Sequence, residues 1–506
     1  MPIPVKYPGV FVQEIPSGNV TITGVETSIT AFVGRTVMGP LAPMHCFSAA
    51  DFERAFGGRA AGYPLGDAVW DFFGNGGSHA IIVRVFKAPA GAGDGLARAE
   101  GGGLTLVAAA PGAWPNGRLL MSIDATLGSV DSFNLALTYK APDGSETVER
   151  FQDVSINGDA GPHRLDQVLE TQSKLARVPG DRLPVATPTA VTDVPFAGGA
   201  DSAGLDAADL TGDPELHTGI YALDDVDLFN LMCIPPDPAD ADYGDLETLY
   251  QAGALYCLKR RAMLILDPPK AWSDHARQGR IDQIQPADLG IGGPELEARN
   301  CAVYFPRIRK ADPKTGQIET FPVCGAIAGI FAATDNLRGL WKAPAGITAG
   351  IGGINGLEFD LNDDQNGELN PLGINCLRNF PVEGPVVWGA RTLRGADMLS
   401  DDYKYVPVRR LTLFIEESLY RGTKFAVFEP NDEALWSTLR QTIGAFMTDL
   451  SRQGAFYGYD VACDRTTTTQ ADIDRGVVNV RVAFAPVKPA EFIVLQIQQL
   501  AGQTAP

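Results

Sequence analysis

The sequence predicts a mixed α/β fold divided into several domains. At about 100–200 residues per domain, its 506 residues are enough for about three. Hydrophobic residues make up 45% of the chain and charged residues 20%, which are the proportions of an ordinary globular protein. The 56 glycines and 36 prolines favour strands, turns and loops over a helical bundle. Strand-like and helix-like segments alternate along much of the chain, which is the pattern of an α/β protein.

The acidic balance of the chain argues against some partners. Its formal net charge is −20, and its isoelectric point is about 4.7. Such a surface repels phosphate groups, so we expect no nucleic-acid binding, and it repels anionic membranes in the same way. Copies of so charged a chain also repel one another, and a polymer built from them needs short-range contacts that overcome this repulsion.

The cysteines and the amino-terminal residues predict a chain that folds in a reducing cytoplasm. The seven cysteines are odd in number, widely spaced and without any CxxC pair, which indicates reduced thiols. The start, "MPIPVKYPGV", has neither a long apolar stretch nor a cleavage signal. No run of about 18 apolar residues occurs, so we expect no membrane span and no direct membrane insertion.

The first 200 residues predict three parts. Residues 1–25 contain four prolines and a short β-prone run, so we expect an extended arm. Residues 26–90 predict a compact α/β part, with a helix capped by Ser48 and a strand, "HAIIVRVF", whose apolar run predicts burial on both faces. Residues 91–200 begin with a glycine-rich linker and continue as strands with turn clusters, which predicts an inserted β-rich domain.

The remaining residues predict an α/β domain, a mixed domain and a second arm. Residues 201–375 alternate strand and helix in the pattern of a parallel sheet. Residues 376–488 contain a long helix with one apolar stripe, "NDEALWSTLRQTIGAFMTDLSRQG", and an alternating strand, "VVNVRVAFAP". Residues 489–506 contain a last strand, "FIVLQIQQL", with nothing after it to pack against. We expect this last segment to be a C-terminal strand arm.

Three segments suggest chemistry, and each has a plainer interpretation. Asp267 follows the apolar run "AMLIL", as in a nucleotide hydrolase where it would hold Mg²⁺, but no phosphate loop occurs, which favours a buried strand before a turn. The segment "GITAGIGGINGLEF" lacks dinucleotide-binding spacing, which favours a loop with close backbone contacts. The run "NDDQNG" at 362–367 resembles the first half of a calcium loop, but the twelfth position is Gly373, which favours a polar turn.

The sequence contains no other catalytic or metal-binding pattern. The five histidines are scattered without ligand spacing, and no metal-spaced Cys/His cluster or nucleophile–base motif occurs. We therefore expect no catalytic residue, no cofactor and no metal.

Segments at both ends and in the middle of the chain carry a family resemblance. Near the start they are "KYPGVFVQEIPSG" and "TSITAFVGRTVMGP", and in the middle "LWKAPAG", "LNPLGINCLRNFP" and "GPVVWGARTL". Toward the end they are "YVPVRRLTLFIEESLYRGTKFAVFEPNDEALW" and "VVNVRVAFAPVKPAEFIVLQIQQ". In this order and combination they resemble the tail sheath family of contractile phages, pyocins and extracellular contractile injection systems. The resemblance covers about two-fifths of the chain and leaves out residues 91–200.

The resemblance implies a structural subunit, not an enzyme. Its α/β sheath core is built from N-terminal and C-terminal parts, and the β-rich domain is a peripheral insertion. Such subunits form stacked hexameric rings around an inner tube and contract to drive the tube through a target envelope. The implied partners are other copies of this chain, the inner tube protein, and baseplate and terminator or cap proteins. Assembly takes place in the bacterial cytoplasm, as part of a phage tail or of a phage-tail-like particle that can be released.

Three sets of residues are the candidate contact sites. Strands at the two ends expose backbone edges that join subunits by strand addition. The N-terminal set is Tyr7, Pro8, Gly9, Val10, Phe11 and Val12. The C-terminal set is Phe492, Ile493, Val494, Leu495, Gln496 and Ile497. The third set lies on the helix over 432–453, off its apolar stripe, where the resemblance implies a tube-facing surface: Trp436, Arg440 and Arg452.

Two other functions stay open at this point. One is an α/β enzyme of the hydrolase type that uses Asp267, and the other is a non-contractile structural protein of a capsid or baseplate. The two termini can also pair with each other as a hairpin within one subunit, which would remove the need for strand addition between subunits.

Overall fold

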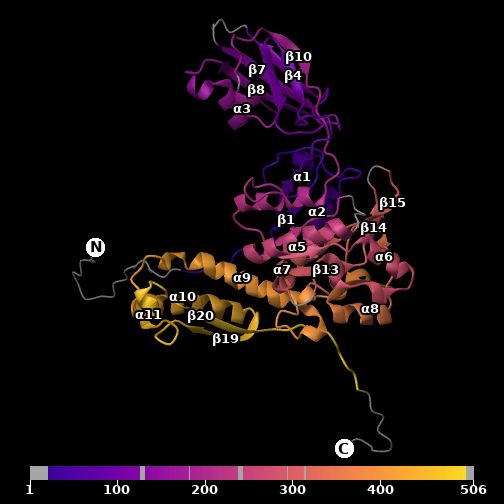
Figure 1. Cartoon of the computed structure of the whole chain (residues 1–506), viewed down its shortest axis with the longest axis vertical. Helices are drawn as coiled ribbons and strands as arrows, with labels where there is room; N and C mark the ends of the chain where they lie inside the picture. The colour runs from indigo at the N-terminus through magenta and orange to yellow at the C-terminus, as the bar shows by residue number, and fades with distance from the viewer. Residues whose placement is uncertain are drawn as a thin grey trace, which may run out of the picture. The chain divides into compact units, whose positions relative to one another are not determined.

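The computed structural model describes residues 21–125, 132–181, 183–237, 243–292, 295–312 and 315–496 (Figure 1). The chain divides into two compact units. The central unit is Glu26–Arg409, and the terminal unit joins Met1–Val25 to Arg410–Pro506. The two ends of the chain therefore belong to one unit, with the central unit between them in the sequence.

The main sheet of the central unit has eight strands among the described residues, in the order β18-β17-β13-β12-β11-β1-β3-β2. The middle six strands run parallel, and the two edge strands are antiparallel to their neighbours. Because β11 pairs with β1, the segments before and after the inserted residues share one sheet. The strands are β1 (Thr30–Gly34), β2 (Met44–Cys46), β3 (Ala80–Arg84), β11 (Leu231–Cys233), β12 (Met263–Leu266), β13 (Cys301–Phe305), β17 (Ile374–Phe380) and β18 (Gly384–Val387).

The parallel strands are apolar throughout because both of their faces are covered. Every residue of β1, β3, β12 and β13 is buried. Successive side chains point to opposite faces and enter two cores. On β1, Val33 enters the first core and Phe32 the second. The strands that the sequence predicted over "HAIIVRVF" and "AMLIL" are confirmed as β3 and β12.

Helices cover the two faces of the sheet. The first core holds side chains from α4 (Ala207–Thr211), α5 (Tyr243–Arg260), α6 (Lys270–Arg277) and α8 (Asp363–Leu369). The second holds side chains from α1 (Ala49–Phe56), α2 (Pro64–Gly74) and α7 (Cys324–Arg338). Gly325 and Gly329 let α7 approach α2 closely, because a Cβ on either residue would clash with the α2 backbone. The predicted cap of α1 is confirmed: Ser48 accepts from Asp51 N–H at 3.1 Å.

A small three-stranded sheet lies beside α2 in the same unit. Its antiparallel strands are β14 (Ile308–Ala311), β15 (Ile318–Phe321) and β16 (Gly356–Leu357). Lys310 on β14 points to α2 and is buried. This pairing brings a charged strand residue into contact with the helix.

The described part of the inserted segment forms two antiparallel sheets and an α-helix around a separate core. One sheet has the order β10-β6-β7-β8 and the other β4-β5-β9. The elements are β4 (Arg98–Gly101), β5 (Leu104–Ala108), β6 (Leu119–Asp124), β7 (Ser132–Lys140), β8 (Glu146–Ser155), α3 (Leu165–Gln172), β9 (Ala176–Arg177) and β10 (Val191–Pro195). The two ends of this segment meet, since Ala200 N–H donates to Gly95 O at 3.1 Å.

The terminal unit is built on two long helices and a two-stranded sheet. Its elements are α10 (Glu433–Arg452), β19 (Phe456–Ala462), α11 (Gln470–Asp474), β20 (Arg481–Pro486) and most of α9 (Val406–Gly422), which begins in the central unit. Asp432 caps α10 and accepts from two backbone N–H groups. The apolar stripe predicted on this helix is buried, including Leu439, Ile443 and Met447.

The predicted class, a mixed α/β fold with several domains, is confirmed, but three details differ. The expected boundary between residues 375 and 376 falls inside β17, because this strand completes the main sheet. Residues 21–25 of the expected arm pack on α9, where Ile22 is buried. Residues 492–496 of the expected last strand have no regular secondary structure within the chain.

Candidate assembly surfaces

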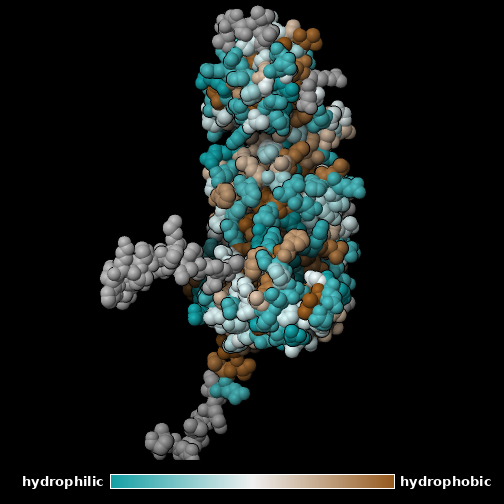
Figure 2. All heavy atoms as spheres, turned by 90° about the vertical axis from the view of Figure 1, so that its left-hand side faces the viewer, coloured by the Kyte–Doolittle hydropathy of each residue, from teal (hydrophilic) through white to brown (hydrophobic). Residues whose placement is uncertain are grey.

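The C-terminal candidate residues form an uncovered apolar run. Phe492, Ile493, Val494 and Leu495 are 72–82% exposed. Figure 2 shows a group of brown, hydrophobic spheres near the bottom of the molecule, followed by a teal group and then by grey spheres. Exposure of four consecutive large apolar side chains to water is unfavourable for a free subunit. This run is therefore a candidate for burial against another protein surface. Gln496 is exposed as well, and Ile497 lies outside the described residues.

The N-terminal candidate residues, Tyr7 to Val12, lie outside the described residues. The residues that follow them are anchored in the terminal unit. Val25 N–H donates to Ser418 Oγ on α9 at 3.2 Å. Gly422 accommodates Ile22, because a Cβ at this glycine would come within 2.6 Å of the isoleucine side chain. Ile22 therefore lies at the C-terminal end of α9.

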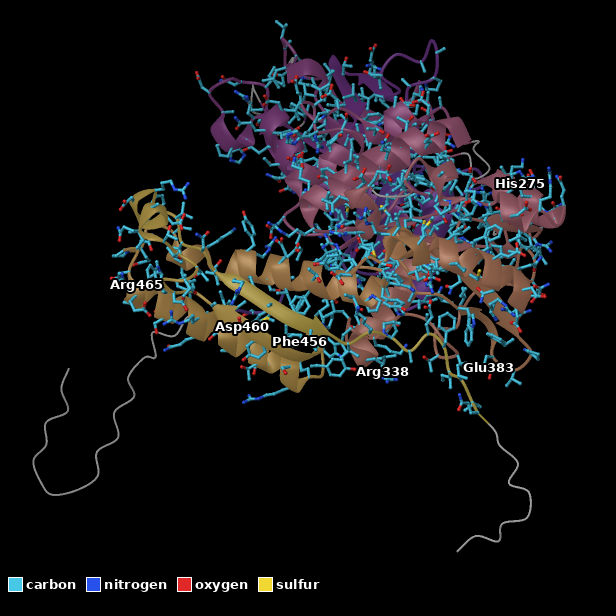
Figure 3. All side chains as sticks on the ribbon, turned by 60° about the horizontal axis from the view of Figure 1, so that its bottom comes forward. His275, Arg338, Glu383, Phe456, Asp460 and Arg465 are labelled. Carbon is cyan, nitrogen blue, oxygen red and sulfur yellow. The ribbon has the colours of Figure 1, made fainter. Side chains whose placement is uncertain are left out.

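The two-stranded sheet of the terminal unit has free backbone edges. Strands β19 and β20 pair antiparallel, and among the described residues no third strand joins them. One face packs on α10, where the hydroxyl groups of Tyr459 and Thr448 are 2.6 Å apart. Phe456 is buried, and Asp460 on the same strand is exposed and pairs with Arg481 at 3.2 Å (Figure 3). Free sheet edges accept added strands.

The structure separates the three candidate residues of α10. Trp436 is 2% exposed and donates from Nε1 to Asn431 Oδ1 at 2.9 Å, so the prediction that it lies off the apolar stripe is wrong. Trp436 precedes Ile443 by seven residues, which puts both on the same side of the helix. Arg440 is engaged, with one nitrogen 2.6 Å from Glu433 Oε1 and another on the Cys463 carbonyl. Arg452 is 76% exposed beside Asp449, at 3.6 Å.

Asp267 is a helix cap in a fully buried place. Its Oδ1 accepts from Val323 N–H at 2.6 Å and Cys324 N–H at 2.9 Å, at the start of α7. Burial raises the pKa of this carboxyl group in spite of these hydrogen bonds. With 1% of its surface exposed, Asp267 has no access to a substrate in this conformation. The geometry favours the structural interpretation of this residue.

The other segments with chemical patterns also have structural roles. Asn362 caps α8 by accepting from Gln365 N–H at 2.8 Å, so the expected polar turn is the start of a helix. The glycine-rich loop lies along β18, where Ile351 N–H donates to Pro385 O at 2.9 Å.

Among the described residues, no group of three or more His, Cys, Asp or Glu side chains is arranged to hold a metal ion. No described helix is long and apolar enough to cross a membrane.

One histidine pair was not expected from the sequence. His45 Nδ1 and His79 Nε2 are 2.8 Å apart, because β2 and β3 pair side by side. His79 Nδ1 lies 3.2 Å from a carboxylate oxygen of Glu26. Burial and the neighbouring His79 lower the pKa of His45. Residues 34 positions apart show no spacing signal, so only the strand pairing brings them together.

A hollow of about 170 Å³ lies beside α2, and Arg59, Asp71 and Lys310 are among its lining residues. These side chains belong to a charge cluster. Lys310 Nζ lies 2.6 Å from Asp71 Oδ2 and 3.3 Å from Asp67 Oδ1. Arg59 Nε lies 2.6 Å from the same Asp67 oxygen. Burial outweighs the attraction of Lys310 and raises the pKa of Asp71 to about 6. Two cations and two carboxylates compensate one another, so the cluster joins α2 to β14 without a net charge.

Two family models match the chain. Residues 228–393 match the phage tail sheath protein central domain, and residues 400–499 match the phage tail sheath C-terminal domain. The tail sheath protein of Vibrio phage KVP40 is 26% identical over 318 residues, which are 59% of this chain and 45% of that protein. The tail sheath protein of Burkholderia phage BcepMu is 23% identical over 97% of this chain and 96% of its own length. The chain thus spans less than half of the KVP40 relative and almost all of the BcepMu relative.

Solved structures share the fold. The contracted helical sheath of the anti-feeding prophage matches 98% of this chain and 99% of its own, with a TM-score of 0.59 and 22% identity. The sheath tail protein of Listeria innocua matches 92% of this chain and 96% of its own, with a TM-score of 0.59 and 11% identity. Because the two matched family segments, 228–393 and 400–499, together cover more than half of the 506 residues, the protein belongs to the phage tail sheath family.

Proposed function

We propose that the protein is the structural subunit of a contractile tail sheath. It polymerises as stacked hexameric rings around an inner tube, and the polymer shortens to drive the tube through a target cell envelope. The observation that carries this proposal lies in the terminal unit: an uncovered apolar run at 492–495 and a two-stranded sheet that no third strand of the described residues joins. A chain that has both an extended segment able to act as a β-strand and a sheet edge able to accept one can form an open-ended polymer.

The subunits are joined through their terminal segments. The C-terminal run, and the N-terminal run around Val10, Phe11 and Val12, leave their own subunit and add to the β19–β20 sheet of neighbours. Pro486 ends β20, Pro489 lies between β20 and the C-terminal run, and together they keep this connection extended. Backbone pairing of this kind tolerates rotation of the subunit bodies, because the connecting segments need not keep a fixed angle.

The parts of the subunit have separate positions in the sheath. Residues 91–200 are an inserted peripheral domain that faces away from the tube, and the terminal unit supplies the surface that faces it. The partners are other copies of the chain, the inner tube protein, the baseplate and a terminal cap. The sheath assembles in the bacterial cytoplasm as part of a phage tail or phage-tail-like particle. It needs no cofactor and no catalysis, because the extended polymer stores its energy at assembly.

Electron microscopy of the purified protein tests this function. We expect long hollow cylinders whose outer layer contains the inserted domain. The same preparation should hydrolyse ATP no faster than buffer, and Asp267→Asn should assemble like the wild type, because Asn keeps an oxygen to cap α7. Particles of uniform size without cylinders would favour a capsid or baseplate component. ATP hydrolysis that disappears in Asp267→Asn would favour the hydrolase.

The exposed end of α10 is expected to contact the tube. Reversing the charge in Arg452→Glu should weaken tube attachment of the extended sheath about tenfold, equivalent to ~1.4 kcal/mol. The contracted lattice should change less. Co-sedimentation with the inner tube protein measures the effect. Arg54→Glu is the matched control, because Arg54 is 74% exposed and also pairs with an aspartate three residues away on a helix. If Arg452→Glu weakened the extended sheath and the contracted lattice equally, Arg452 would not belong to the tube interface.

A further inference from the structure

One aromatic residue of the terminal unit is held in a strained conformation. Phe428 follows α9 and has a backbone φ of +70°. The left-handed region is unfavourable for residues with a Cβ, and for a bulky residue it is a clear outlier. Such strain persists only where surrounding structure fixes it, and it gathers at functional sites.

The strain does not serve to bury the side chain. Phe428 is 103% exposed, and the preceding Val427 is 62% exposed. In most loops a large aromatic side chain would fold back onto the nearest core, since this buries about 150–250 Å². Here the backbone presents the ring to solvent instead. We call these two residues, Val427 and Phe428, the knob.

Hydrogen bonds hold the loop at the base of the knob. Val427 N–H donates to Lys424 O at 3.3 Å, and Glu429 N–H donates to Ala426 O at 3.4 Å. Asn431, three residues beyond Phe428, accepts from Trp436 Nε1 at 2.9 Å and donates to Val477 O at 3.0 Å. Below the loop lies a small core whose buried members are Leu435, Trp436, Leu439 and Cys463. The knob is therefore preorganised and does not need to be ordered when a partner binds.

The distribution of charge favours a second copy of this chain as the partner. Residues 1–25 and 410–506 hold 10 Lys and Arg against 12 Asp and Glu, a net charge of −2. The other residues hold 31 against 49, a net charge of −18. Like-charge repulsion between copies is therefore weakest at the terminal unit. Lys424 and Glu429, both exposed, flank the knob with opposite charges, so a neighbouring copy meets no single sign there.

We propose that the knob of each subunit inserts into the surface of a neighbouring copy in the assembled polymer. This contact is separate from strand addition by the terminal segments, and it rests on the proposed sheath function. It explains why a strained backbone exposes an aromatic ring: the ring is covered only after assembly.

Phe428→Gly tests the proposal with opposite expected effects on the free subunit and on the polymer. Glycine adopts a φ of +70° without strain, so the unfolding temperature of the free subunit should stay at or above that of the wild type. The subunit concentration needed for cylinder growth, measured without inner tube protein, should rise at least about tenfold, as expected for the loss of an aromatic anchor. Phe428→Asn, which also tolerates this backbone, should behave in the same way.

The matched control is Val185→Gly, which removes another fully exposed apolar side chain, at 104% exposure, from the inserted domain. This variant should assemble like the wild type. Cylinders of Phe428→Gly at the wild-type concentration would overturn the proposal. The proposal would also be overturned if Phe428→Gly assembled normally without inner tube protein and lost assembly only in its presence. The inner tube would then be the partner of the knob. If the wild-type chain itself forms no cylinders, the proposed function fails and the knob contact fails with it.

Discussion

Removal of residues 490–506 is expected to leave a folded, soluble subunit that does not polymerise. Its described residues, 490–496, have no regular secondary structure, and the apolar run within them is exposed. In the polymer each backbone hydrogen bond of an added strand contributes about 0.5–1.5 kcal/mol. About four to six such bonds, with the apolar side chains that become buried, give roughly 5–10 kcal/mol for each arm. Loss of that free energy should abolish cylinders at any practical concentration.

A truncation of residues 1–15 should have the same effect. It ends before Ile22 and Val25, which anchor the segment on α9, so the folded unit is kept intact. Electron microscopy detects the polymer, and circular dichroism and gel filtration establish that the monomer is folded. Normal cylinders from either truncation would refute strand addition and favour a hairpin of the two termini within one subunit.

A single substitution separates backbone pairing from burial of side chains. Val494→Pro removes one N–H group from the proposed ladder and keeps an apolar side chain, so it should block assembly almost as fully as the truncation. Val494→Thr keeps the N–H group and the β-branched shape, and it should assemble with at most a modest loss. Removal of residues 498–506 alone leaves the apolar run in place and should be tolerated.

Lys310→Met is expected to destabilise the central unit by about 3–5 kcal/mol at pH 7.5, because it leaves Asp71 buried without its cation. Lys310 and Asp71 are 4% exposed and 2.6 Å apart. The long methionine side chain fills the same space, and the Phe321 ring, 4.6 Å from Lys310 Nζ, gives it an apolar neighbour. The cost is therefore electrostatic and not a cavity. Chemical denaturation measures it.

The pH dependence gives a second test of the same pair. The folded-state pKa of Asp71 is about 6, above the ordinary value of 3.8, so the protonated carboxyl group favours folding. Its stabilising contribution is complete below the unfolded-state pKa and is lost as the pH rises through about 6. Removal of Lys310 raises this pKa further. The difference between Lys310→Met and the wild type should therefore shrink from pH 7.5 to pH 5.

The matched control is the double variant Lys310→Met with Asp71→Asn, which removes both charges. It should recover most of the lost stability at pH 7.5, because Asp67 keeps its contact with Arg59. The interpretation fails if the double variant is as unstable as Lys310→Met, or if the penalty is the same at pH 7.5 and pH 5.

Local patterns predicted the elements that depend on local chemistry. The apolar run of β3 indicated a strand buried on both faces, the run before Asp267 indicated the buried strand β12, and Ser48 indicated the start of α1. The stripe through Leu439, Ile443 and Met447 indicated α10. These predictions are confirmed because side-chain alternation, helical spacing and capping depend on residues that are close together in the sequence. The domain boundary at residue 375 failed, because β13, the strand that pairs with β17 in the main sheet on its parallel side, lies far away in the sequence.

The sequence by itself determined the fold class, the main strands and helices, the acidic charge, and the exposed apolar character of the C-terminal run. Only the tertiary structure decided the roles of single side chains. Asp267 caps a helix, Trp436 lies in a core, and Lys310 contacts Asp71, which is 239 positions away in the chain. The strained exposure of Phe428 was equally invisible, since a backbone angle depends on how the whole loop is held. Contacts between distant residues follow from the packing of whole elements, and a single sequence does not record that packing.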